Sequence, residues 1–176
     1  MNDNPESASP QEELETAPPE ETQWHRLFLC IGLAFGVAWI LLIPPFQTPD
    51  EYNHFYRAIS FAQGHLCCHP VIGESGTGVV LPGALIRTEE ELAARDISVI
   101  TSPSKQSNPQ DLARLIAALD VRMRQGDTRY YEFSNTCNYS FIGYVPQTII
   151  SFIGYSLNLP VLIVLYLIRG ANLIVY

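Results

Sequence analysis

The sequence predicts an all-α integral membrane protein with two to three transmembrane helices and one long loop that carries amphipathic helices. Residues 27–46 carry no charge over about twenty positions, the length needed to cross roughly 30 Å of hydrocarbon. Residues 141–157 and 160–168 are also free of charge. Between these apolar stretches, residues 47–140 are of mixed polarity. A connection of that length is too long to lack structure in a compact protein.

The N-terminal segment, residues 1–25, is expected to be a disordered acidic tail. Residues 1–23 contain seven Asp and Glu and no Lys or Arg, and Pro, Glu, Ser and Thr dominate there. Such a composition cannot bury enough apolar surface to fold. No basic patch occurs along the chain, so nucleic acid is not an expected partner.

The first transmembrane helix is expected at residues 26–46. Pro44 and Pro45 end it, because the proline ring removes a hydrogen-bond donor and clashes with the preceding turn. A cleaved signal peptide is not favoured, because the leading segment is long and acidic and no small-residue cleavage pattern follows.

Two further transmembrane helices are expected at residues 141–158 and 160–176. Asn158 and Pro160 punctuate the two segments, which predicts a tight helical hairpin, or one span followed by a truncated one. The apolar run continues to Tyr176. We therefore expect the N-terminal fragment of a larger polytopic protein, and a complete small protein is the alternative.

The long loop is expected to contain helices at about residues 49–63, 89–95 and 109–125. Thr48-Pro49-Asp50-Glu51 has the form of a helix start, with Thr48 as N-cap and Glu51 completing a capping box. These helices are expected to rest on membrane or protein, and a small satellite core is the alternative. Residues 71–87 are rich in Gly and β-branched residues, which is typical of an irregular hairpin.

The first loop helix carries a polar stripe. Asp50, His54 and Arg57 are four and then three residues apart, so they share one helix face, and an aromatic and aliphatic face lies opposite. This amphipathic pattern predicts a helix along the membrane surface. In the alternative, purely structural interpretation, the acidic residues complement the helix dipole, His54 is a surface histidine and Arg57 anchors to lipid phosphate.

Cysteine placement allows a disulfide if the loop faces an oxidising compartment. Cys137 could then pair with Cys67 or Cys68, and a vicinal Cys67–Cys68 bridge is the alternative.

The first apolar stretch is followed by the string Pro-Pro-Phe-Gln-Thr-Pro-Asp-Glu-Tyr-Asn-His-Phe. This string resembles the signature of bacterial predicted membrane proteins called domain-of-unknown-function family 2142. A later part of the chain is also similar to that family: it contains Tyr144-Val145-Pro146-Gln147, followed by Leu165-Tyr166-Leu167-Ile168-Arg169 and Asn172. The resemblance covers about residues 27–176, which correspond to the N-terminal part of the family.

That family in turn resembles the GT-C glycosyltransferases, multi-span membrane enzymes that take sugars from polyprenyl-phosphate donors. The resemblance implies a multi-pass protein of the bacterial cytoplasmic (inner) membrane, of which this chain forms the N-terminal part of a GT-C-like fold. Such a protein would act in cell-envelope polysaccharide assembly. Residues 1–25 would be cytoplasmic and residues 47–140 extracytoplasmic. The expected partners are membrane lipid and a polyprenyl-phosphate sugar donor.

The resemblance also implies roles for individual residues. Asp50 is the candidate catalytic base and Glu51 its partner, since a carboxylate near the interface can deprotonate an acceptor hydroxyl. The same two carboxylates are candidate ligands of a divalent cation, Mg or Mn. His54 and Arg57 would bind acceptor or donor phosphate, for which a guanidinium offers a bidentate contact. Arg169 is a further candidate, because an intramembrane charge is costly unless it is used or paired.

Two other functions are weighed against an enzyme. The chain has fewer spans than a GT-C enzyme needs to enclose a lipid-linked donor, so this segment is not expected to catalyse alone. The alternatives are a non-catalytic membrane scaffold or partner-binding protein, and an inactive truncated gene product.

Overall fold

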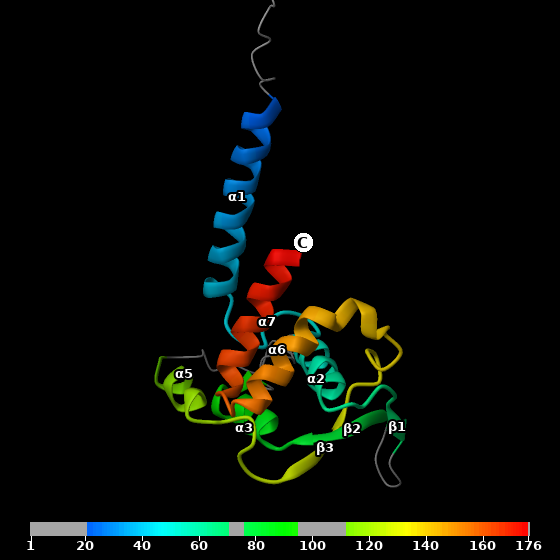
Figure 1. Ribbon diagram of the computed structural model, residues 1–176. Coiled ribbons are helices and arrows are strands. Elements are labelled where there is room, and N and C mark those ends of the chain that lie inside the picture. The colour runs from blue at the N-terminus through cyan, green and yellow to red at the C-terminus, as the bar shows by residue number, and fades with distance from the viewer. Residues whose placement is uncertain (1–20, 71–75, 95–111, 176) are drawn as a thin grey trace, which may run out of the picture.

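The computed structural model describes residues 21–70, 76–94 and 112–175. One long helix, α1 (Glu21–Leu42), projects from a folded unit that contains the other helices and a small sheet (Figure 1). Most of the expected tail, residues 1–20, lies outside the described residues.

Helix α1 is the candidate membrane span. Within the described part of the chain, Trp24–Leu42 is the one helix long and apolar enough to cross a bilayer. Its large apolar side chains, such as Phe28, Phe35 and Trp39, are exposed, which suits a lipid environment. The helix ends before Pro44 and Pro45, as the proline pair predicts.

Helix α2 (Glu51–Ala62) lies in the core of the folded unit. The residues from Phe55 to Phe61 are all buried, including Arg57, which the sequence placed on the polar face. The predicted capping box is wrong. Asp50 occupies the N-cap position without a side-chain cap bond, and Glu51 accepts a hydrogen bond from the backbone N–H of Phe46 at 2.8 Å instead.

A three-stranded antiparallel sheet covers one side of the unit. Strands β1 (His69–Pro70), β2 (Thr77–Pro82) and β3 (Thr128–Glu132) follow the order β1-β2-β3, and Val79 pairs with Tyr131. The all-α class is therefore corrected to mostly helical with a small sheet. Strand β3 pairs with a segment about fifty residues earlier, which no local pattern reveals.

Two short helices complete the long connection. Helix α3 (Ala84–Glu91) begins earlier than the helix expected at 89–95, and α5 (Leu112–Leu119) falls inside the one expected at 109–125.

The last third forms a helical hairpin. A short 3₁₀ helix, η1 (Phe141–Tyr144), leads into α6 (Val145–Ser156), and α7 (Val161–Val175) returns beside it. Helix α6 packs against α2 and α7, and α7 also contacts α1. At 12 residues α6 is about 18 Å long, shorter than the hydrocarbon layer. The number of spans beyond α1 stays a prediction.

Candidate functional site

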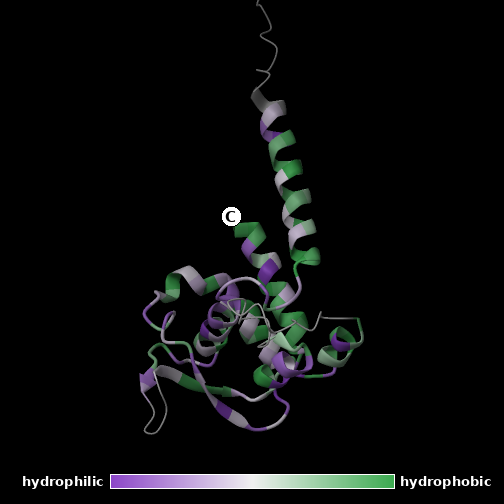
Figure 2. Cartoon of the chain, turned by 180° about the vertical axis from the view of Figure 1, so that it is seen from behind, coloured by the Kyte–Doolittle hydropathy of each residue, from purple (hydrophilic) through white to green (hydrophobic). Residues whose placement is uncertain are grey.

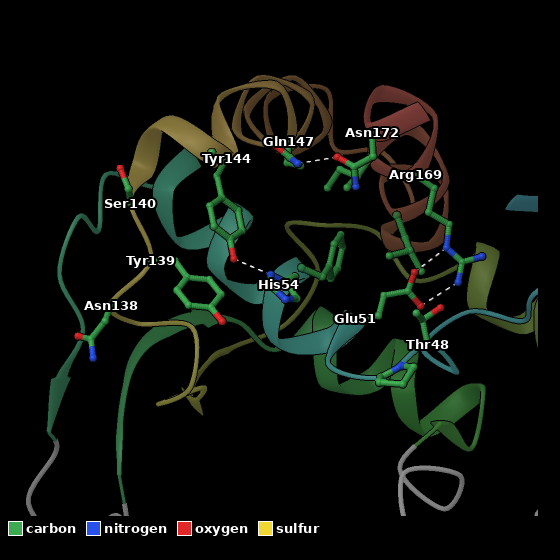
Figure 3. Close-up of a pocket in the computed structure, with 15 residues that line it drawn as sticks. Thr48, Glu51, His54, Asn138, Tyr139, Ser140, Tyr144, Gln147, Arg169 and Asn172 are labelled. Carbon is green, nitrogen blue, oxygen red and sulfur yellow. Dashed lines mark hydrogen bonds and ion pairs between the residues drawn. The ribbon is translucent and has the colours of Figure 1, made fainter. Parts of the chain in front are cut away.

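A cavity of about 670 Å³ lies between the start of α2, the segment before η1, the start of α6 and the second half of α7 (Figure 3). Its lining combines aromatic rings, carboxamides and one ion pair. The polar and aromatic lining residues are Thr48, Glu51, His54, Phe55, Asn138, Tyr139, Ser140, Tyr144, Gln147, Arg169 and Asn172.

Glu51 and Arg169 form a bidentate ion pair at one end of this cavity. Arg169 donates from Nε to Glu51 Oε1 at 2.6 Å and from Nη2 to Glu51 Oε2 at 2.8 Å. Both side chains are largely buried, with 10% of Arg169 and 13% of Glu51 exposed. Two parallel charge-assisted hydrogen bonds hold the carboxylate in one orientation.

The same guanidinium also donates hydrogen bonds to backbone carbonyl groups at the C-terminal end of the candidate span. Nη1 donates to the carbonyl oxygens of Ile40 and Ile43, and Nη2 donates to that of Pro44. With the two bonds to Glu51, all of the N–H groups of the guanidinium have acceptors. Arg169 therefore joins α1, α2 and α7, and a bound phosphate would have to compete with these partners.

His54 lies close to two tyrosines, away from the ion pair (Figure 3). Its Nδ1 is 2.6 Å from the hydroxyl oxygen of Tyr144, and its ring stacks on that of Tyr144 with centroids 5.9 Å apart. The ring of Tyr139 is also close to the imidazole, with centroids 5.8 Å apart. Burial, followed by the neighbouring Tyr139, raises the pKa of Tyr144 to about 12. The phenol therefore keeps its proton at neutral pH.

A pair of carboxamides lies between the ion pair and the tyrosines. Gln147 Nε2 donates to Asn172 Oδ1 at 2.5 Å, which links α6 to α7. Gln147 Oε1 is buried and has no hydrogen-bond partner within the described residues. An unsatisfied buried acceptor is uncommon in folded proteins, and beside a cavity it offers a contact to a ligand.

Asp50 lies at the edge of the site and is exposed to solvent. Its backbone is left-handed (φ 58°), a conformation that Asp and Asn adopt more readily than most residues. Its Oδ1 accepts hydrogen bonds from Asn53 Nδ2 at 3.3 Å and from Asn135 Nδ2 at 3.2 Å. The adjacent carboxylates thus differ: Glu51 is held in an ion pair, whereas Asp50 faces water.

Arg57 lies apart from the cavity. It is 2% exposed, donates from Nη2 to the carbonyl oxygen of Leu66 at 3.0 Å, and stacks over the ring of Phe61 at 3.9 Å. Burial lowers the pKa of Arg57 below its ordinary value. The structure therefore brings Glu51, His54 and Arg169 to one cavity, with Asp50 at its edge, and leaves Arg57 in the core.

No group of three or more His, Cys, Asp and Glu side chains suited to a metal ion occurs among the described residues. A divalent cation at Asp50 and Glu51 stays a prediction. Such a cation would have to share Glu51 with Arg169, which is the counter-ion of that carboxylate here.

A disulfide supports the wall of the cavity. Of the two pairings with Cys137 that the sequence left open, the structure contains Cys68–Cys137. The bridge joins the segment after α2 to the one that leads into Asn138, Tyr139 and Ser140.

Tyr139, Tyr144, Gln147 and Asn172 were not assigned to the site from sequence. Gln147 and Asn172 could have been found, because each is a polar residue within an otherwise apolar segment, where polar side chains usually have a function or a partner.

A second, smaller cavity of about 370 Å³ lies between α1 and α7. Apolar residues line it, including Trp39, Ile40 and Leu173, and it shares Thr48, Glu51, Arg169 and Asn172 with the larger cavity. The Glu51–Arg169 pair thus lines both cavities, the second of which lies beside the candidate span.

Comparison with known proteins identifies the family but no characterised relative. No curated protein and no solved structure matches the chain. The model of one family, described as predicted membrane protein (DUF2142), matches residues 33–176, which include α1 from its middle onward and every residue of the cavity. The chain therefore belongs to the DUF2142 family of predicted membrane proteins.

Proposed function

We propose that the chain is the N-terminal part of a polytopic, glycosyltransferase-like protein of the bacterial cytoplasmic membrane. In this proposal the cavity at the end of α1 binds the sugar of a polyprenyl-phosphate-linked donor, for cell-envelope polysaccharide assembly. The supporting observation is a cavity lined by aromatic rings, carboxamides and an ion pair, which shares four lining residues with a second cavity beside the candidate membrane span.

The lining of the larger cavity suits a hydroxylated ring. Tyr139, Tyr144 and Phe55 supply flat apolar surface, while Gln147 and Asn172 supply donors and acceptors that can meet hydroxyl groups. The apolar cavity along α1 offers a place for the first part of a lipid chain, since Trp39, Ile40 and Leu173 line it.

Within this proposal the two carboxylates have separate tasks. Asp50 acts as the general base toward an acceptor hydroxyl, because it is exposed and lies next to cavity residues Pro49 and Glu51. Its left-handed backbone is also a conformation that recurs at functional sites. Glu51 and Arg169 hold the start of α2 against α1, and this fixes the position of Asp50.

The extracytoplasmic location of residues 47–140 belongs to the same proposal. The Cys68–Cys137 disulfide supports it, because disulfides persist in oxidising compartments and are rare in the cytosol.

A non-catalytic membrane scaffold is the second candidate. It is favoured by the pairing of Arg169 and Glu51 with each other and by the burial of Arg57, which leave few charged groups free for a substrate.

Complementation of a deletion strain with the complete gene distinguishes the two candidates. Asp50→Asn keeps a residue that tolerates the left-handed backbone and removes the base, so folding should be unchanged and activity should fall about 100- to 10,000-fold. We expect Asp50→Asn to fail at normal protein level, and the matched control Asp127→Asn, an exposed acid near β3, to restore growth.

Full complementation by Asp50→Asn at a normal expression level would contradict the catalytic proposal and favour the scaffold.

A further inference from the structure

We propose that η1 and α6, as far as Ile153, lie in the membrane surface on the side of the folded unit that faces α1, with their exposed apolar face against lipid, and that this segment does not cross the bilayer. This inference concerns the placement of the fold in the membrane and does not depend on the proposed function.

The outward face of η1 and α6 is continuously apolar. Residues 133–168 contain no charged side chain. Ile142 is 81% exposed and Phe152 is 59% exposed, values unusual for large apolar residues in water. The exposed face consists of Phe141, Ile142, Val145, Ile149, Phe152 and Ile153. The opposite face is packed, because Tyr144, Ser151 and Gly154 are buried against the folded unit.

Hydrogen bonds and packing place the start of α6 at the depth of the last two turns of α1. Arg169 binds the carbonyl groups at the end of α1. Asn172, almost one turn further along α7, accepts the hydrogen bond from Gln147 near the start of α6. The next residue of α7, Leu173, packs against Gly36, so this part of α7 lies beside the candidate span, at the level of Gly36.

The other end of α6 is held on the side of the sheet and the loop helices. The backbone N–H of Arg124 donates to Asn158 Oδ1 at 2.9 Å, and that of Met123 donates to the Leu159 carbonyl at 3.0 Å. Helix α6 therefore runs from the side of the folded unit nearest α1 toward the loop helices (Figure 1). Both of its ends lie on the same side of the bilayer in this arrangement.

Lipid is the occupant that best explains this face. It carries no charge, and it lies on the side of the folded unit from which the apolar helix α1 projects (Figure 1 and Figure 2). A short helix with one packed face and one apolar face is suited to the interface between head groups and acyl chains.

Spin labels test this placement in the full chain reconstituted in lipid vesicles. Cys30→Ser and Cys67→Ser remove the two free thiols of the described residues and leave the Cys68–Cys137 bridge intact. A single label is then introduced by Ile149→Cys, by Phe152→Cys or, as the matched control on the exposed side of β2, by Val80→Cys. We expect higher accessibility to oxygen and lower accessibility to a water-soluble nickel complex at 149 and 152 than at 80.

Two results would overturn the inference. Nickel accessibility at 149 and 152 equal to that at 80 would place the face in water. Protection of 149 and 152 from both reagents would instead identify a protein partner or a second copy of the chain.

A second measurement distinguishes an interfacial helix from a crossing one. In the same background, Leu157→Cys and Val80→Cys should react with a membrane-impermeant thiol reagent from the same side of sealed vesicles. Reaction from opposite sides would mean that α6 crosses the bilayer and would refute the inference.

Discussion

At the scale of single residues, Asp50 and Glu51 are neighbours in sequence with different surroundings. Their acidic character and their place at the start of a helix could be predicted from the motif after the first apolar stretch. Their separation could not, because the counter-ion of Glu51 is 118 residues away on α7. Arg57 shows the converse limit: helical spacing placed it with His54, but tertiary packing buries it.

Tyr144 gives a prediction about alkaline stability. Burial raises its pKa from the usual value of about 10 to about 12. The folded protein therefore holds this proton more tightly than the unfolded chain does. Its contribution to stability is complete below about pH 10 and is lost as the pH rises toward about 12. Tyr144→Phe should remove this loss, which denaturant unfolding in detergent across that pH range would measure.

Tyr139→Phe is the control, because Tyr139 is 50% exposed. A Tyr144→Phe protein whose stability falls with pH as steeply as that of the wild type would show that Tyr144 does not carry the effect.

At the scale of helices and strands, the strongest sequence signals came from apolar length and from proline. They predicted the end of α1 and the hairpin between α6 and α7, where Asn158 adopts a positive φ of 52°. The sheet was missed because β2 and β3 pair Val80 with Tyr130 across a long connection. The polarity of α2 was also misjudged, since the loop that buries Arg57 is not visible in the helix itself.

The Glu51–Arg169 pair predicts a large stability effect for one arginine. Removing one partner of a largely buried pair leaves an uncompensated charge, so Arg169→Gln should cost about 3–5 kcal/mol in unfolding free energy. The matched control is Arg129→Gln, because the Arg129–Asp127 pair is exposed and such pairs contribute about 1 kcal/mol or less. Chemical denaturation in detergent compares the two.

Adding Glu51→Gln to Arg169→Gln should recover part of the lost unfolding free energy, since a neutral carboxamide then replaces the unpaired carboxylate. Equal destabilisation by Arg169→Gln and Arg129→Gln would contradict the account of Arg169 as the link between α1, α2 and α7.

At the scale of the whole molecule, the disulfide connects two segments that the sequence separates by 69 residues. The loop-closure model gives a stabilisation of about 4 kcal/mol for a loop of this length. Replacing both Cys68 and Cys137 by Ser should lower the unfolding free energy by about 2–5 kcal/mol, whereas Cys67→Ser should have little effect because Cys67 is free and exposed. Unreduced peptide mass spectrometry and denaturant unfolding check both statements; equal stability of the two variants would rule out a structural role for the bridge.

The family of predicted membrane proteins and the candidate span at α1 could be predicted from the sequence. The cavity itself could not, because its walls come from four segments between Thr48 and Asn172 that meet only in the folded state. Gly143 lies in one of these walls, and a Cβ atom added there would meet nothing within 4 Å. The first atom of a larger side chain at this position therefore meets no neighbour, and we expect the rest of the side chain to take up space in the cavity.

The central claim, that the cavity binds a lipid-linked sugar, is tested most directly by measuring the affinity for polyprenyl-phosphate-linked hexoses in lipid nanodiscs. Gly143→Leu should weaken binding by about tenfold or more, a loss of about 1.4 kcal/mol, because the leucine occupies the ligand space. Gly32→Leu makes the same change on α1, where an added Cβ also meets nothing within 4 Å, and should bind like the wild type. Equal affinity of Gly143→Leu and Gly32→Leu, or the absence of binding to the wild type, would contradict the claim.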